Sequence, residues 1–400
     1  MDSGALFLTG SSGFVGMELL ARYLGRSDRT IYALIRGSDQ DEAGERLRAA
    51  AQTVVHDAHR FDHRLVAVRG DVTTPGLGID PDLRQQLAEE VTAVVHSAAS
   101  VSFSLPLDEA RAINVDGTRR VLELAELCAE RGDGLARFSH VSTSYVAGTH
   151  CGPFYEEDLD RGQHFNNSYE MSKWEAEKML RHRFGDLPTT VFRPSIVVGE
   201  SDSGWTPAFN VVYGPLRAYS RGSLRAVPGR RSAPADVVPV DYVADAIFEL
   251  SGRPDAEGRT YALAAGPESS TVGQLIDMSA EAFGRRRAIA LRPKLYRRLV
   301  HPWLLRRSSE SKRKVLRRSE VYFPYFAVDA SFDNSAAADA LVPAGIRVPP
   351  LDAYFHSLVR FAQEADWGRS PLTRVEAREA VEEPRAAERR ARRPLEPVSV

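Results

Sequence analysis

Two side chains four residues apart, Tyr169 and Lys173, could perform acid–base chemistry. On a helix this spacing places both side chains on one face, and residues 174–180 continue a helical pattern. Such a pair is common by chance and usually lies on a protein surface. Here it follows Thr143 by one strand and one loop, in a chain that opens with a glycine-rich turn. This arrangement favours a catalytic site.

The chemistry that this trio predicts is proton donation to an oxygen atom. A free tyrosine has a pKa of about 10, and an adjacent ammonium lowers that value. We expect Lys173 to lower the pKa of Tyr169, and Tyr169 to protonate an oxygen that becomes negative as a hydride arrives. Thr143 would donate a second hydrogen bond to that oxygen. Asn114 could position a water or a backbone group near Lys173, or could cap its own helix.

A glycine-rich turn near the start of the chain predicts a dinucleotide site. Residues 5–9 form an apolar run, and apolar residues recur at helical spacing after the turn. Gly10 permits a backbone angle that a side chain forbids. Gly13 lets the main chain approach a pyrophosphate, and Gly16 lets the helix pack close to the strand. The expected cofactor-binding residues of this turn are Thr9, Gly10, Ser12, Gly13, Phe14, Val15 and Gly16.

The second expected strand, residues 30–35, ends at Arg36. An acidic residue at this place binds the ribose of NAD, whereas an arginine suits the 2′-phosphate of NADP. We therefore predict NADPH as the cofactor, bound in part by Arg36. Asp39 and Asp41 follow closely and leave NADH as the alternative. Lys173 would hold the nicotinamide ribose beside Tyr169.

Strand and helix patterns alternate regularly through the first half of the chain. We expect further strands at residues 65–68, 91–96, 135–141 and 190–194, with long helices at 108–131 and from 169. This alternation predicts an α/β fold, a Rossmann-type doubly wound parallel sheet with a smaller C-terminal substrate-binding subdomain. The expected divisions are 1–200 for the NADP-binding domain and 201–366 for the subdomain. Within the latter, 240–265 would return to the core, and 367–400 would form a charged, disordered tail.

Composition restricts the classes of partner. A net charge of -2 gives no indication of a nucleic-acid partner. Two cysteines favour a reducing compartment, and only four residues precede the first expected strand, so we expect a cytoplasmic protein. No apolar run is long enough to span a membrane. His56, His59 and His63 could share a helix face, but they lack a further ligand, and no metal site is predicted.

Residues 285–318 contain many basic residues and a single acid, Glu310. Apolar residues, including Trp303, are interleaved at helical spacing. The simplest interpretation is a solvated helical hairpin. The alternatives are a landing site for coenzyme A phosphates or for an acidic acyl carrier protein, or a helix in peripheral contact with a membrane surface.

Several motifs together resemble one branch of the extended short-chain dehydrogenase/reductases. That branch comprises the thioester-reductase domains and the male-sterility-like fatty acyl-CoA reductases. The resemblance covers roughly residues 5 to 265. The motifs that carry it are residues 9–16, 32–36, 70–72 with 77–79, 96–103, 114–118, 142–143, 169–177 and 193–199 with Gly204.

The resemblance implies a Rossmann-type fold, NADPH, and reduction of an acyl thioester to an aldehyde or alcohol. No adenylation or carrier domain is evident in the sequence, so the acyl group is expected to arrive from outside, as an acyl-CoA or on an acyl carrier protein. The family pattern also implies that an aspartate after the third strand contacts adenine. Further cofactor-binding residues expected on this basis are Asp71, Val72, Ser97, Ala98, Ala99, Pro194, Ser195 and Ile196.

The catalytic trio fixes hydride chemistry but not the carbonyl compound that is reduced. An epimerase or dehydratase of nucleotide sugars, or a hydroxysteroid-type dehydrogenase, could use the same scaffold. A cofactor-binding regulator without catalysis is a further alternative. The turn at residues 77–79 and the segment 101–103 favour the thioester reductases, and the intact trio argues against a regulator.

Overall fold

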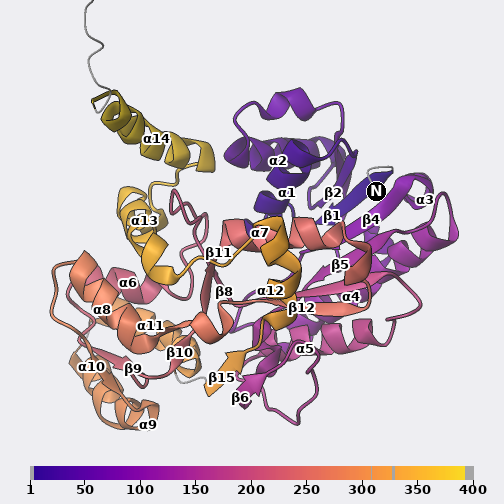
Figure 1. Cartoon of the computed structure of the whole chain (residues 1–400). Helices are drawn as coiled ribbons and strands as arrows, with labels where there is room; N and C mark the ends of the chain where they lie inside the picture. The colour runs from indigo at the N-terminus through magenta and orange to yellow at the C-terminus, as the bar shows by residue number, and fades with distance from the viewer. Residues whose placement is uncertain (1–3, 308, 327–328, 392–400) are drawn as a thin grey trace, which may run out of the picture.

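A parallel sheet of seven strands forms the centre of the molecule (Figure 1). The computed structural model describes residues 4–307, 309–326 and 329–391. The spatial strand order is β12-β7-β5-β4-β1-β2-β3, and every neighbouring pair is parallel. The strands are β1 Ala5–Thr9, β2 Ile31–Ile35, β3 Leu65–Arg69, β4 Val91–His96, β5 Arg137–Val141, β7 Thr189–Pro194 and β12 Arg259–Leu263.

Helices cover both faces of this sheet, because its strands are short apolar runs that must be buried on both sides. One core lies between the sheet and α1 Phe14–Arg26, α2 Gln40–Val54 and α7 Val240–Ser251. The other lies under α3 Pro81–Glu90, α4 Leu107–Glu130 and α5 Ser168–Arg181. The predicted Rossmann-type doubly wound sheet is confirmed. Its direction of winding reverses between β1 and β4, where such folds bind ligands at the carboxyl ends of the strands.

The second half of the chain returns to the sheet more than once. β12 extends the sheet beside β7, and α7 packs on α1. A short helix near the C-terminus, α12 Ser335–Leu341, also packs against α7 and β12, which the predicted boundaries did not include. The reason is its alanine-rich face, since Ala337 and Leu341 are buried in the core on that side of the sheet.

A smaller group of elements lies beside the carboxyl edge of the sheet. α6 Tyr213–Ser220 packs on α8 Val272–Ala282, and α13 Leu351–Glu364 lies against α8. Short strand pairs connect these elements to the rest of the molecule: β8 Ile196–Val198 with β11 Val237–Pro239, β9 Ala226–Pro228 with β14 Ile289–Leu291, β10 Pro234–Ala235 with β13 Ser270–Thr271, and β6 Cys151–Phe154 with β15 Asp329–Phe332.

The basic segment forms helices at the edge of the molecule (Figure 1). Its first part is one helical run made of α9 Pro293–Leu295, a π-helical turn Tyr296–Val300 and α10 His301–Arg307. α11 Glu310–Ser319 follows, and the 3₁₀ turn η7 Glu320–Phe326 leads back to the main body. No helix of the described ranges has both the length and the apolar character needed to cross a bilayer.

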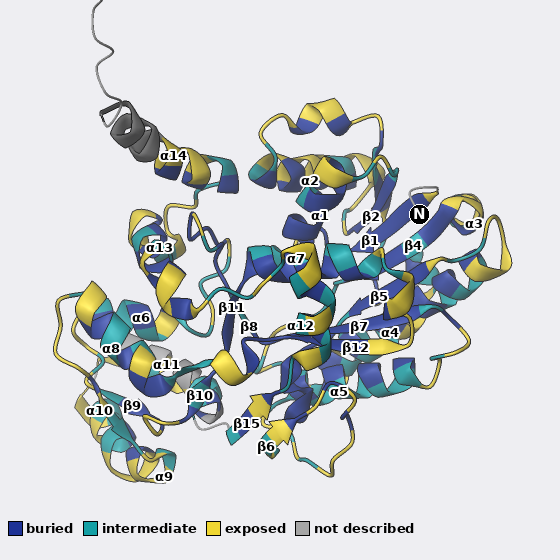
Figure 2. Cartoon of the chain, in the orientation of Figure 1, coloured by how far each residue is buried: buried dark blue, intermediate teal, exposed yellow. Residues whose placement is uncertain are grey.

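The predicted disorder of residues 367–400 is wrong for much of that segment, because α14 spans Arg374–Ala391. Its first turn is fixed by Arg374, which donates to Glu18 Oε2 over 2.7 Å and to the carbonyl of Val54. Arg378 pairs with buried Glu200. The charged composition suggested a solvated tail, yet these charges meet buried carboxylates. The end of α14 nearest the main body includes buried positions (Figure 2). Residues 392–400 lie outside the described residues.

Replacing Arg374 by alanine should destabilise the fold, because Glu18 is fully buried and loses one of its two arginine partners. We expect the free energy of unfolding, measured in urea, to fall by about 2 kcal/mol. The exposed Arg131, changed to alanine, is the matched control. An Arg374→Ala variant as stable as the Arg131→Ala variant would show that α14 does not contribute to the folded state.

Candidate active site

The three predicted catalytic side chains meet at the carboxyl end of β5. Thr143 caps the 3₁₀ turn η3 Ser144–Ala147 by accepting a hydrogen bond from the Tyr145 amide. Tyr169 and Lys173 lie on α5, which packs against that turn. The Thr143 hydroxyl lies close enough to the Tyr169 hydroxyl to influence the pKa of Tyr169. Thr143 also donates to the carbonyl of Pro194, over 3.4 Å, which ties β7 to the same point.

The expectation that Lys173 lowers the pKa of Tyr169 is wrong for this structure. Burial raises the pKa of Tyr169 to about 12, and the nearby Thr143 hydroxyl opposes that shift. The Lys173 ammonium is directed elsewhere, donating to the Val141 carbonyl over 2.7 Å. Tyr169 is therefore protonated at neutral pH, which is the state that a proton donor requires.

Lys173 carries its ammonium into the interior, where only 2% of the residue is exposed. Burial lowers the pKa of Lys173 to about 8, while the negative charge of Glu177, one turn further along α5, acts in the opposite direction. A lysine with this pKa can be charged or neutral near physiological pH.

Two histidines beneath Lys173 were not predicted as site residues. His140 Nε2 lies 3.4 Å from Lys173 Nζ, and His96 occupies the matching position on the adjacent strand. His96 bonds through Nδ1 to Thr9 and through Nε2 to Thr118, at 2.8 and 3.0 Å. Burial, followed by the charge of Lys173, lowers the pKa of His96 to about 3 and that of His140 well below its usual value. Both rings are neutral, so they add no positive charge beside the lysine.

Asn114 connects the cofactor side of the site to α5. Its Oδ1 accepts from the Ser100 amide over 2.8 Å, and its Nδ2 donates to the Ser100 carbonyl and to Ser172 Oγ. Asn114 therefore holds the turn after β4 and the residue before Lys173. It neither caps its own helix nor contacts Lys173 directly, so it is a positioning residue.

A buried ion pair connects α5 to β7. Glu177 pairs with Arg193 over 2.7 Å and accepts from Ser142 Oγ over 2.6 Å. Burial opposes ionisation, yet Arg193 holds the pKa of Glu177 below its usual range. Arg193 also donates to the Asp158 carbonyl. Both residues fall in motifs recognised in the sequence, but only the fold reveals that they face each other.

The glycine-rich turn has the geometry that a dinucleotide needs. Gly10 has φ of 77°, and a Cβ there would lie 2.7 Å from the Ala98 amide nitrogen. A Cβ on Gly16 would overlap the Gly10 carbonyl. Ser12 and Gly13 are exposed, and the buried Ser11 hydroxyl has no hydrogen-bond partner among the described residues. These features fit a phosphate at the start of α1. Phe14 and Val15 lie in the first turn of α1, whereas Thr9 is fully buried and bonded to His96.

Arg36 follows β2 directly and is exposed. Within the described ranges it forms no ion pair. Asp39 is already engaged, because its carboxylate caps α2 by accepting from the Glu42 amide over 2.8 Å. That bond lowers the pKa of Asp39. Asp39, one of the two acids that kept NADH open as the alternative, therefore has a structural role.

The remaining cofactor residues lie at the carboxyl ends of other strands. Asp71 follows β3 and accepts from the amide and hydroxyl of Thr73, forming a turn, while Val72 is buried against α4. The turn after β4 contains Ser97, Ala98 and Ala99, and Ala98 donates to Thr9. Pro194, Ser195 and Ile196 join β7 to β8 beside Thr143. The structure thus places these segments along one edge of the sheet.

An aromatic cluster that the sequence analysis did not identify covers Tyr169. The ring centroids of Phe103 and Tyr169 are 5.6 Å apart. The Phe103 ring also stacks on that of Tyr325, with 5.0 Å between the centroids. Tyr325 donates to the buried Glu170 over 2.6 Å. Burial raises the pKa of Glu170 despite this bond. The basic segment, residues 285–318, is therefore followed by η7, which places Tyr325 in the aromatic cluster on Tyr169.

Tyr325 also borders an apolar pocket between α6, α8 and η7. One of its lining residues is Ile196, two residues after the end of β7. Its other lining residues include Val212, Leu216, Val227, Val237, Leu275, Ile276 and Phe326. An apolar lining of this kind suits a hydrocarbon group.

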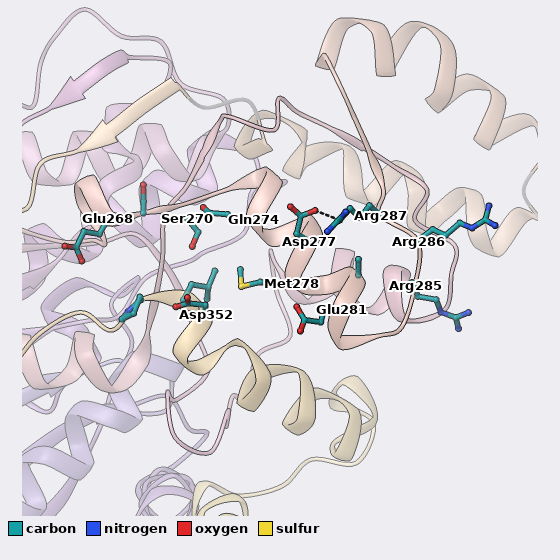
Figure 3. Close-up of a pocket in the computed structure, with 14 residues that line it drawn as sticks. Glu268, Ser270, Gln274, Asp277, Met278, Glu281, Arg285, Arg286, Arg287 and Asp352 are labelled. Carbon is teal, nitrogen blue, oxygen red and sulfur yellow. Dashed lines mark ion pairs between the residues drawn. The ribbon is translucent and has the colours of Figure 1, made fainter.

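A larger open pocket of about 930 Å³ lies on the outer side of α8 (Figure 3). Charges of both signs line it, and Asp277 pairs there with Arg287. None of the predicted site residues lines this pocket, so we place the active site at the edge of the sheet. The described residues contain no group of three histidine, cysteine or acidic side chains placed to hold a metal.

Comparison with known proteins agrees with this arrangement. The family described as "Male sterility protein", a group of NAD-binding domains, matches residues 8–247, more than half of the chain. The chain belongs to this family. Its membership confirms the resemblance seen in the sequence and makes the N-terminal part an NAD(P)-binding domain.

Individual relatives extend the family match. The fatty acyl-CoA reductase wat of Drosophila melanogaster is 30% identical over 289 residues, 62% of this chain and 53% of that protein. The aldehyde reductase lnaA of Aspergillus flavus is 28% identical over 393 residues, 90% of this chain and 36% of that protein. The chain thus spans about half the length, or less, of these relatives. The terminal R domain of the myxalamid PKS-NRPS pathway superimposes with a TM-score of 0.79, at 27% identity, covering 92% of this chain and 93% of that one.

The buried Lys173 predicts a specific dependence of stability on pH. Its pKa of about 8 lies below the value in an unfolded chain, so the unfolded state binds more protons between those two values. The free energy of unfolding should therefore rise with pH across that window. We expect wild type to gain about 2 kcal/mol relative to Lys173→Met between pH 7.5 and 9.5, in urea titrations. Parallel pH profiles for the two proteins would mean that the ammonium is solvated.

Proposed function

We propose that this protein is an NADPH-dependent reductase of acyl thioesters, and that Thr143, Tyr169 and Lys173 form its catalytic site. The observation that carries the proposal is a protonated Tyr169 close to Thr143. The same sheet carries a glycine turn that fits a phosphate, and the aromatic cluster on Tyr169 includes Tyr325, which lines the apolar pocket. The family match and the relatives named as fatty acyl-CoA and terminal reductases support the same chemistry.

In this mechanism the glycine-rich turn at residues 9–16 would hold the nicotinamide cofactor, which when bound would supply a hydride for the thioester carbonyl carbon. As the carbonyl oxygen gains negative charge, Thr143 donates a hydrogen bond to it and Tyr169 transfers its proton. The product is a hemithioacetal, whose carbon–sulfur bond then breaks to release a thiol and an aldehyde. Lys173, one turn after Tyr169 on α5, would bind the nicotinamide ribose. A second round on the aldehyde would give an alcohol.

The apolar pocket is the proposed place for the acyl chain. Ile196 and Tyr325 line it, and Tyr325 stacks on Phe103, which in turn contacts Tyr169. Coenzyme A or an acyl carrier protein would deliver the chain, and both carry phosphate. We propose that the protein prefers NADPH because Arg36 can bind the 2′-phosphate, whereas Asp39 is occupied in capping α2.

Replacing Tyr169 by phenylalanine tests the function and the donor together. We expect acyl-CoA-dependent NADPH oxidation by wild type, and a kcat about a hundredfold lower in Tyr169→Phe, because one donor to the developing charge is lost. NADPH binding, followed by nucleotide fluorescence, should persist in the variant. Tyr155→Phe, which changes an exposed tyrosine, is the control. Full activity in Tyr169→Phe would remove it from the mechanism.

The cofactor preference gives a separate test at Arg36. Wild type should bind NADPH more tightly than NADH, and Arg36→Ala should narrow the ratio of the two dissociation constants by about tenfold. Arg48, an exposed arginine on α2, provides the matched control as Arg48→Ala. Equal affinities in wild type would contradict the NADPH assignment while leaving the reductase proposal intact.

An epimerase or a hydroxysteroid-type dehydrogenase remains the alternative on this scaffold, since it would use the same trio. A hydroxysteroid-type dehydrogenase would oxidise NADPH with a ketone and not with an acyl thioester, and an epimerase differs in net oxidation. An epimerase shows no net oxidation of NADPH, whereas a thioester reductase consumes one equivalent for each aldehyde formed.

A further inference from the structure

The helical run 293–307 exposes an apolar stripe. Leu295, Leu299 and Trp303 are 45%, 59% and 52% exposed, and their spacing of four residues puts them on one side of the run. The opposite side is buried, with Tyr296 and His301 packed on the ring of Phe323, at centroid distances of 5.4 and 5.3 Å. The stripe therefore faces away from the rest of the protein. Three large apolar side chains in a row on one exposed helix indicate a contact surface.

Positive charge surrounds this stripe. Residues 282–309 contain nine arginines and lysines and no acidic residue. Arg297 and Arg298 lie beside Leu299 in the sequence, and Arg307 lies over the Trp303 ring at 5.0 Å. Across the described part of the chain, no carboxylate forms an ion pair with these three arginines. Figure 1 shows α9 and α10 at the edge of the molecule, remote from α2.

The charge and shape of the stripe indicate its partner. A second copy of the chain would bring the same positive charge to the contact and be repelled. A protein partner would need a groove to receive a convex helix, whereas a lipid surface accommodates it directly. Leucine and tryptophan on one face, with flanking arginines, are the features of helices that lie in an anionic membrane interface. The arginine stems can extend along the apolar layer while their charges reach lipid phosphates.

We propose that the run 293–307 docks the protein on an anionic lipid surface, with Leu295, Leu299 and Trp303 entering the interface. The surrounding arginines bind the lipid headgroups. This docking is independent of the proposed reductase activity. Through α11 and η7, the docked helix is continuous with Tyr325, which borders the apolar pocket.

Vesicle sedimentation with the full chain tests the proposal. We expect binding to mixed phosphatidylcholine–phosphatidylglycerol vesicles, weakened by salt, and little binding to phosphatidylcholine alone. The double change Leu299→Gln with Trp303→Gln should weaken binding by about tenfold or more, and so should Arg297→Gln with Arg298→Gln. Trp303→Phe should retain binding because it keeps the apolar face. Arg48→Gln with Arg131→Gln, in exposed positions outside the stripe, is the charge control.

Fluorescence gives a second readout that does not depend on the glutamine variants folding. Brominated lipids in the mixed vesicles should quench wild type more strongly than Trp303→Phe, since only Trp303 would enter the interface. Equal binding to the two vesicle types would overturn the proposal, as would equal quenching of the two proteins. Binding to an acidic protein without binding to anionic vesicles would assign the stripe to a protein partner and would also overturn it.

Discussion

The burial of the Lys173 ammonium is the constraint on which the site depends. A buried cation is costly, and the structure offsets that cost with the Val141 carbonyl and the charge of Glu177. Glu177 is ionised because Arg193 pairs with it. Burial lowers the pKa of Lys173 and of the two histidines nearest to it, and the charge of Lys173 lowers the histidine pKa values further, so both rings are neutral. One helix, α5, thus places Tyr169 at the edge of the sheet while its other turns are held in the interior.

Residue patterns predicted the elements that position the site. The glycine turn, the strand endings and the Tyr169–Lys173 spacing are local features, and the parallel sheet follows from their alternation. Contacts between distant segments were not predictable in this way. His96 and His140 become neighbours only when β4 and β5 pair, and Tyr325 reaches Glu170 across more than 150 residues. The pKa of Tyr169 was predicted in the wrong direction because the sequence shows the nearby lysine but not the burial.

The C-terminal third also contains contacts between distant segments that residue patterns did not predict. Its charged residues suggested solvated surface. Arg378 is exposed, yet it pairs with the buried carboxylate of Glu200. The expectation failed at Arg374, which is itself buried against Glu18. It held at Arg306 and Arg307, which are exposed. Composition alone does not distinguish these cases, because it does not show whether a buried carboxylate lies within reach of each arginine. The aromatic side chains of η7 connect this part of the chain to Tyr169 and give the apolar pocket one of its walls.

The most direct test of the account follows the hydride itself. The protein would be incubated with a fatty acyl-CoA and NADPH that carries deuterium on the transferred position of the nicotinamide, and the product would be analysed by mass spectrometry. The account predicts an aldehyde or alcohol with deuterium on its first carbon and stoichiometric release of free coenzyme A thiol. Oxidation of NADPH without deuterium in the acyl product, or an unchanged thioester, would contradict it.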